Sequence, residues 1–267
     1  MWSGSTLHKR SGNLLGAHQK FDRVAAKFVH TLRPEHYFPN GKEILLFEGN
    51  NGPDAIKRKS PGKDEPWHYW DPTDETDTVL LDIVVNHFNG LVKALKNVDH
   101  ERSAFEAAWL AHAVVDGMTP AHHYPYEQKL IELRGGAAND TRNSIKKKVM
   151  IKGDTKRQTI SNNWKLWGSK GLMLSHHLFE AGVSTNSQTL RLKKAVPQNA
   201  DVRHAQNIGL KAYLKEQVME IYKLNMYERF LRTNWSPNLI RDVRSKLAPT
   251  ITHTVAVIWI LAVDEAS

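Results

Sequence analysis

The chain has 267 residues, a formal net charge of +9 and no cysteine. Its 40% hydrophobic and 24% charged residues are ordinary for a soluble globular protein, and the chain is long enough to bury a sizeable core. The absence of cysteine excludes disulfides and thiolate metal sites, so any metal site must use histidine and carboxylate side chains. The positive charge favours anionic partners, namely phosphate esters, nucleic acid or an acidic membrane surface.

Helical periodicity dominates the sequence, and clear strand alternation is hard to find. A first helix is predicted over about residues 13–32, with His18 on its apolar face. A long loop rich in Pro, Gly, Asn and Asp follows over residues 33–77, and loops of this length in a compact domain are usually functional. A second helix is predicted over residues 78–97, and Asp99 is expected to cap a third.

The second half of the chain continues the helical pattern. A short helix is predicted over residues 124–133, and the very basic segment 141–160 is expected to be a solvated loop. We find no internal repeat and no clean domain boundary, so the sequence predicts one compact, multi-helix, all-α domain over residues 1–267. The remaining helices are predicted over about residues 162–182, 201–232 and 237–263, the last with a bend at Pro249.

Neither end of the chain is expected to be a targeting or membrane segment. Residues 1–10 contain no apolar stretch of signal-peptide length. The apolar run over residues 252–263 is too short to span a bilayer, so we expect it to form a buried last helix.

The most informative stretch of the chain runs from His112 to His122. His112 and Asp116 are four residues apart and lie on one face of the third helix. Gly117 and Pro120 then end that helix and allow His122 to return toward the same cavity. A single His-x3-Asp pair is more often a surface pair than a ligand set. Together, the side chains of His112, Asp116 and His122 form a zinc-type ligand set. The segment is otherwise apolar, so an unpaired Asp116 buried there would be costly, and a bound metal would offset that cost.

Three other places offer metal donors, and each has an ordinary structural alternative. His176 and Glu180 are four residues apart, but a core histidine beside a surface glutamate has the same pattern. His18 alone would be a hydrogen-bonded core residue. In the long loop, turn chemistry would account for Asp54 after its Gly-Pro turn and for His68 among aromatic residues. One polynuclear metal centre would explain all of them together.

The order of these donors resembles the zinc-dependent phospholipase C family, which shares its fold with the fungal zinc single-strand nucleases. The family pattern is an N-terminal Trp, a His on the first helix, an Asp, a His fourteen residues later, His-x3-Asp-x5-His, and then His-x3-Glu or His-x3-Asp. The resemblance runs from residue 2 to residue 180 and includes the dipeptide Asp71-Pro72 after the loop histidine. The matching residues are Trp2, His18, Asp54, His68, His112, Asp116, His122, His176 and Glu180.

The resemblance implies up to three zinc ions per chain. Asp116 would bridge the first two ions, and the backbone amine and carbonyl of Trp2 would complete the second site. His123 and His177 lie off the spacing and are expected outside the ligand set. The three ligand sets would be Asp54, His68, His112 and Asp116; then Asp116, His18 and Trp2; then His122, His176 and Glu180.

Such a centre would hydrolyse a phosphodiester directly. Zinc lowers the pKa of a bound water to about 7, and several zinc ions stabilise the charge that builds on the phosphate in the transition state. Asp54 is expected to be the catalytic residue that orients or deprotonates the attacking water. No nucleophilic side chain is needed, which agrees with the absence of a Ser or Cys nucleophile motif.

The N-terminus and the headgroup pocket depart from the family pattern. Met1 precedes Trp2, whereas the family's Trp amine becomes a ligand after a signal peptide is removed. Either Met1 is an addition to a mature chain that is secreted or extracytoplasmic, or the native protein lacks this ligand. His8 is an alternative to His18, which we prefer because a regular helix follows it.

The positions that recognise choline in the family are here Ser5, Ala55 and Glu65, which puts a choline site in question.

The leading hypothesis is a monomeric phospholipase C-type phosphodiesterase that acts on a phospholipid, because His-x3-Glu and the lack of cysteine favour it. The rival hypothesis is a zinc-dependent single-strand nuclease, in which segment 141–160 with Trp164 and Trp167 would bind nucleic acid. The same basic segment would suit an anionic membrane surface. A non-catalytic, zinc-stabilised binding domain is the third hypothesis, disfavoured because structural sites seldom need three metals.

Overall fold

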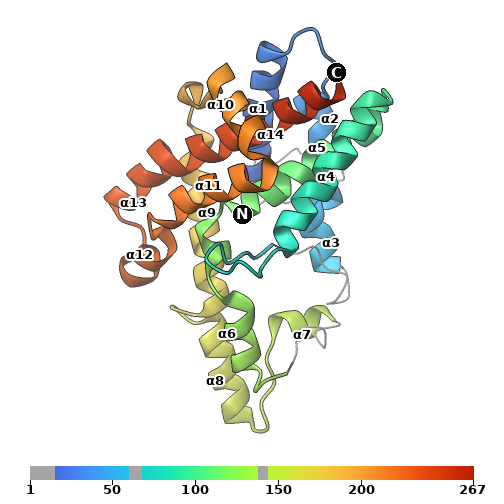
Figure 1. Ribbon diagram of the computed structural model, residues 1–267. Coiled ribbons are helices and arrows are strands. Elements are labelled where there is room, and N and C mark those ends of the chain that lie inside the picture. Colours follow the sequence, from blue (N-terminus) through green and yellow to red (C-terminus); the bar gives the residue numbers. More distant parts are fainter. Residues whose placement is uncertain (1–15, 60–67, 138–143) are drawn as a thin grey trace.

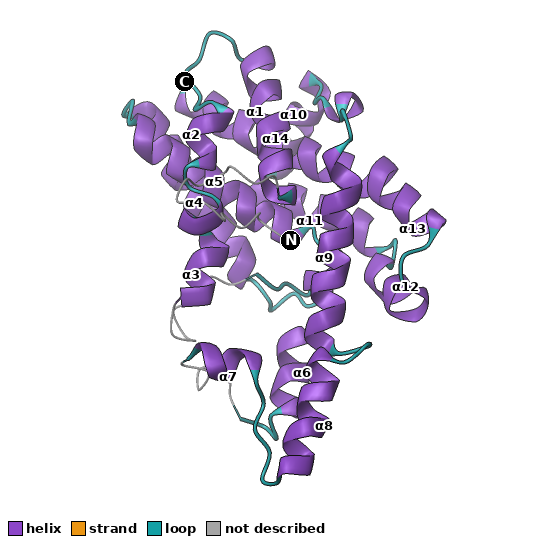
Figure 2. Ribbon diagram, turned by 180° about the vertical axis from the view of Figure 1, so that it is seen from behind, coloured by secondary structure: helices purple, strands orange, loops and turns teal. Residues whose placement is uncertain are grey.

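A computed structural model describes residues 16–59, 68–137 and 144–267. Every regular element within these ranges is a helix, so the predicted all-α class is confirmed (Figure 2). The helices, shown in Figure 1, are α1 (Ala17–Leu32), α2 (Gly41–Leu45), η1 (Gly49–Asn51), α3 (Pro53–Lys59), α4 (Val79–Lys96), α5 (His100–Gly117), η3 (Pro120–His123), α6 (Tyr126–Leu133), α7 (Ile145–Val149), α8 (Lys156–Trp167), α9 (Leu172–Gln188), η5 (Lys193–Ala195), α10 (Asn199–Ile208), α11 (Leu210–Tyr222), α12 (Met226–Thr233), α13 (Pro237–Asp242), η6 (Val243–Leu247) and α14 (Ala248–Ala266).

The last helix, α14, lies in the core against α1, α4, α5 and α10. Its apolar side chains from Ile251 to Val263 are all buried, and the indole of Trp259 donates a 3.2 Å hydrogen bond to the carbonyl of Ala107 on α5. The continuous run Pro237–Ala266 is long and apolar enough to cross a membrane, yet 78% of its most apolar window is buried inside the fold. The expected buried last helix is therefore confirmed.

A π-helical turn, η6, lies directly before Pro249, where a bend was predicted. Proline has no backbone N–H, so a regular helix would leave the carbonyl of Ser245 without its donor. The wider turn over Val243–Leu247 adapts the hydrogen-bond pattern to this missing donor.

The loop predicted over residues 33–77 is wrong in part, because α2, η1 and α3 lie within it. The Asn40 side chain accepts hydrogen bonds from the backbone N–H groups of Lys42 and Glu43, and Glu43 bonds back to the Asn40 backbone. This capping box was readable in the sequence. Pro53 begins α3, a position that suits its fixed φ and its missing N–H.

The two long helices predicted over residues 162–182 and 201–232 are also wrong in extent. The first is split into α8 and α9, and at Gly171, between them, a Cβ would lie 2.6 Å from the Leu166 carbonyl oxygen, so the chain passes close to the end of α8 there. The second is split into α10, α11 and α12 at two left-handed residues, Gly209 with φ +83° and Asn225 with φ +47°. The loop expected for the basic segment is wrong in part, because α7 and the start of α8 lie within it, whereas residues 150–155 between these helices are not helical.

Helices α6, α7 and α8 form a small lobe that projects from one end of the helical bundle (Figures 1 and 2). The lobe has its own apolar cluster of Tyr126, Leu130, Ile151 and Leu166. The Asn163 amide of α8 fixes the α7–α8 connection, since it accepts from the Ile151 N–H at 3.1 Å and donates to the Ile151 carbonyl at 2.7 Å. The lobe continues into α9, which returns the chain to the bundle.

Candidate metal centre

Helix α5 and the turn η3 hold the central donors. Asp99 caps α5 by accepting the backbone N–H of Arg102 at 3.0 Å, and the helix ends at Gly117, as predicted. A Cβ on Gly117 would lie 3.0 Å from the Leu80 side chain, so the glycine allows α4 to pack closely there. Pro120 then begins η3, and this turn brings His122 back toward Asp116 at the end of α5.

Asp116 lies at the centre of the site and is fully buried. One carboxylate oxygen lies 3.4 Å from His18 Nε2 and 3.5 Å from His122 Nδ1. The other lies 3.3 Å from His112 Nε2 and contacts His68 Nδ1. Burial by itself would raise the pKa of Asp116, but nearby positive charge, including that of His122, His112 and His68, holds the pKa well below its usual range. The four histidines thus converge on one carboxylate.

The donors form three groups, and within each group one ligand atom per residue lies within 4.8 Å of the others. All the predicted donors in the described residues take part in a group or, like Asp116, contact several members. The Asp54 group is Asp54, His68 and His112; the Glu180 group is His122, His176 and Glu180; the Glu48 group is His18, Glu48 and His112.

The Glu180 group joins η3 to α9. His122 Nε2 and His176 Nε2 lie 3.0 Å and 3.1 Å from the same Glu180 oxygen, and the two imidazoles stack with centroids 5.3 Å apart. Tyr69 and Tyr126 stack on each other and pack beside both histidines. Burial lowers the pKa of His122 to about 3, so its imidazole is neutral at pH 7, which is the form that binds metals.

The Asp54 group is the open part of the site. The Asp54 side chain is 37% exposed, whereas every other donor side chain in the three groups is at most 11% exposed. Asp54 lies in the first turn of α3 and places Oδ1 3.8 Å from His112 Nε2. Burial raises the pKa of Asp54, but His112 and His68 outweigh it and bring the pKa to about 2. A carboxylate therefore faces solvent beside buried histidines at neutral pH.

Glu48 belongs to the site and was not predicted from the sequence. It is fully buried, and its Oε1 lies 3.2 Å from His112 Nδ1. Although burial opposes it, Glu48 and then Asp116 raise the pKa of His112 well above its usual value in the metal-free protein. As a metal ligand, His112 would carry one ring proton, and with that proton on Nδ1 it would donate to Glu48 and leave Nε2 facing Asp54 and Asp116. A lone glutamate in a loop offers no spacing signal, although the nearby Gly52, whose Cβ would lie 3.0 Å from the Glu48 Cα, leaves room for it.

We expect Glu48→Gln to weaken zinc binding at the Asp54 group by about 10- to 100-fold, because the partner of a ligating histidine sets its tautomer and orientation. Competition against a chromophoric chelator measures the affinity. The matched control is Glu106→Gln, which changes another buried glutamate that pairs with a histidine, His87 at 2.6 Å. An equal loss of zinc affinity in both variants would contradict a specific role for Glu48.

Asp22 is a second residue that was missed, although its spacing from His18 repeats the His-x3-Asp pattern of α5. It is fully buried on α1, and neither carboxylate oxygen has a hydrogen-bond partner among the described residues. Burial and then the neighbouring Glu48 raise its pKa well above the usual value. The charged form of this carboxyl is therefore unfavourable in the metal-free protein.

The raised pKa of Asp22 predicts a pH effect on the stability of the metal-free protein. Its contribution is fully present below the unfolded pKa and is lost as pH rises through the folded pKa. In Asp22→Asn, the free energy of unfolding should therefore fall less between acid and mildly alkaline pH than in the wild type. Urea unfolding of the chelator-treated proteins at several pH values measures this, and parallel pH profiles would contradict it.

Several predicted residues lie outside the groups or outside the described residues. His123 donates a 2.7 Å hydrogen bond to the Gly117 carbonyl, the exposed His177 stacks on Trp167, and neither belongs to the three donor groups. Ala55 is buried on α3. The residues outside the described ranges are Met1, Trp2, Ser5, His8 and Glu65.

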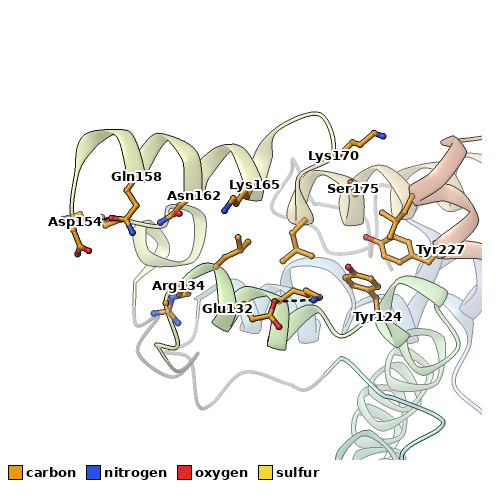
Figure 3. Close-up of a pocket in the computed structure, with 17 residues that line it drawn as sticks. Tyr124, Glu132, Arg134, Asp154, Gln158, Asn162, Lys165, Lys170, Ser175 and Tyr227 are labelled. Atoms are coloured by element: carbon orange, nitrogen blue, oxygen red, sulfur yellow. Dashed lines mark hydrogen bonds and ion pairs between the residues drawn. The ribbon is translucent and has the colours of Figure 1, made fainter.

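A cavity of about 740 Å³ lies beside the metal centre, between α6, α8 and α9 (Figure 3). Ser175, which precedes His176, and Tyr124 line its inner end. None of its lining residues belongs to the three donor groups, so the cavity is a neighbour of the metal centre and not a part of it. Its basic lining residues are Lys129, Arg134, Lys152, Lys165 and Lys170, and its acidic ones are Glu132 and Asp154.

Fold and site together define an all-helical protein with three buried clusters of histidine and carboxylate side chains that could bind metal ions. No model of a protein family matches the chain, and no curated protein matches its sequence. The chain is therefore assigned to no family.

Proposed function

We propose that the protein is a zinc-dependent phosphodiesterase of the phospholipase C type. The observation that carries the proposal is the shared Asp116 carboxylate, which contacts members of all three donor groups. Donors joined in this way place metal ions close enough to act on one phosphate. The His-x3-Glu pair of the Glu180 group and the absence of cysteine favour a phospholipid over a nucleic acid as the substrate.

The donor chemistry fits zinc, since the candidate side-chain ligands in the described residues are imidazole nitrogens and carboxylate oxygens. Within the part of the chain that the structure describes, several buried polar atoms also lack a hydrogen-bond partner, among them Nδ1 of His176 and both oxygens of Asp22. Buried polar atoms of this kind are rare unless something else binds them. We propose the ligand sets Asp54, His68, His112 and Asp116; Asp116, His18 and Trp2; and His122, His176 and Glu180.

Zinc, when bound, supplies Lewis acidity toward the phosphate oxygens and lowers the pKa of water at the site. Asp54 would orient the attacking water through its solvent-facing carboxylate, which its pKa of about 2 keeps ionised at neutral pH. Glu48 holds the His112 ring in one tautomer. The grouped donors other than Asp54 are buried, which would keep water away from the part of the site that lies behind Asp54.

A purified, zinc-loaded sample tests the proposal. We expect release of phosphorylated headgroup from mixed phospholipid vesicles, and no digestion of single-stranded DNA. Cleavage of DNA without cleavage of lipid would overturn the phospholipase assignment in favour of the nuclease. Bound zinc with neither activity would favour the non-catalytic binding domain.

A further inference from the structure

An exposed apolar stripe follows one face of α8. Ile160 is 71% exposed and Trp164 is 68% exposed, more than any other large apolar side chain in the described residues. Trp167, at 37%, continues the stripe, since residues spaced by four and three share a helix face. Val149 of α7, 46% exposed, adjoins it, because its carbonyl accepts the Trp167 indole N–H at 2.7 Å. Exposed apolar patches of this kind mark interaction surfaces.

Basic side chains surround this stripe. Helical spacing places the exposed Lys156 and Arg157 on either side of it, and the exposed Lys146 and Lys147 lie on the adjoining α7. The residues of α8 that line the cavity of Figure 3, which include Lys165, lie on the opposite face of the helix. An apolar face with a basic border matches the interfacial region of an anionic bilayer.

The inner end of the stripe reaches the wall of the metal centre. The Trp167 ring stacks on His177, with centroids 6.0 Å apart. His177 in turn contacts the ring of His176, a member of the Glu180 group, with centroids 5.9 Å apart. Helices α7 and α8, which carry the stripe, belong to the lobe that projects from the bundle (Figures 1 and 2).

We propose that Ile160, Trp164, Trp167 and Val149, with the basic residues beside them, form a docking surface for an anionic phospholipid membrane. A nucleic acid fits less well, because two of the four apolar residues have no aromatic ring and the Trp167 ring already stacks on His177. A bilayer accommodates aliphatic and aromatic side chains alike. Docking goes beyond the proposed phosphodiesterase activity, and its readout is binding to vesicles rather than hydrolysis.

The test measures binding of the zinc-loaded full chain to phosphatidylcholine vesicles with and without phosphatidylglycerol, by sedimentation and by the shift of tryptophan emission. We expect binding that needs phosphatidylglycerol and weakens with salt. Ile160→Ser/Trp164→Ser should reduce partitioning by about tenfold or more, because burial of these side chains drives insertion. Lys156→Gln/Arg157→Gln should reduce binding only to the anionic vesicles.

The matched control is Val79→Ser/Ile208→Ser, which removes exposed apolar side chains, 51% and 39% exposed, from α4 and α10 of the bundle. It should bind vesicles like the wild type. All variants should keep the wild-type zinc content and the wild-type rate on a water-soluble phosphodiester, which separates loss of docking from loss of folding or of the proposed function. Wild-type vesicle binding by Ile160→Ser/Trp164→Ser would overturn the docking surface. The docking surface would also be overturned if the wild-type protein bound a single-stranded oligonucleotide but neither kind of vesicle.

Discussion

Asp116→Asn is expected to lower phosphodiester hydrolysis by about a thousandfold or more and to release zinc from the protein. The asparagine keeps the shape of the side chain but removes the negative charge that four imidazoles face. Because one carboxylate contacts members of all three groups, its loss affects more than one metal site. Elemental analysis of the purified variant and steady-state rates on a phospholipid measure the two effects together.

The control for this variant is Asp242→Asn, which neutralises a partly buried aspartate that pairs with Arg229 at 2.8 Å, away from the donor groups. It should keep its zinc and its activity. If Asp116→Asn retained the wild-type zinc content, the bridging role of Asp116 would be wrong. Circular dichroism of both variants shows whether a loss of zinc accompanies a loss of the helical fold.

Asp54→Asn is expected to lower the hydrolysis rate by about 10²- to 10⁴-fold while most of the zinc is retained. Asp54 is the donor that faces solvent, and the buried donors of the Glu180 group are untouched by its replacement. Its pKa of about 2 means that the carboxylate is fully ionised above about pH 4. An acid limb in the wild-type pH–rate profile near neutrality would therefore come from another group.

The matched control for Asp54 is Asp71→Asn, on the exposed turn that follows His68. Its carboxylate accepts the backbone N–H of Thr73 at 2.9 Å and belongs to none of the donor groups. We expect wild-type turnover from this variant. Full activity in Asp54→Asn on both a lipid and a soluble phosphodiester would exclude Asp54 as the group that activates water.

Local patterns carried the prediction of the helices and of most donors. The four-residue spacing of His112 and Asp116, and of His176 and Glu180, is a property of helix geometry and needs no tertiary information. Asp99 as the cap of α5 followed from the same local rules. The boundaries that failed, at Gly171, Gly209 and Asn225, depend on close backbone approach or on left-handed residues, which periodicity does not reveal.

The sequence by itself determined the all-α class, the buried last helix and the kind of chemistry, because the absence of cysteine leaves only imidazole and carboxylate donors. Only the tertiary structure decided which donors meet, since it brings His18 of α1 and His68 of the loop before α4 to Asp116 on α5. It also decided that Glu48 pairs with His112 across 64 residues and that Asp54, alone among the grouped donors, opens to solvent. Burial and through-space distance have no local signature in the chain, whereas spacing along a helix does.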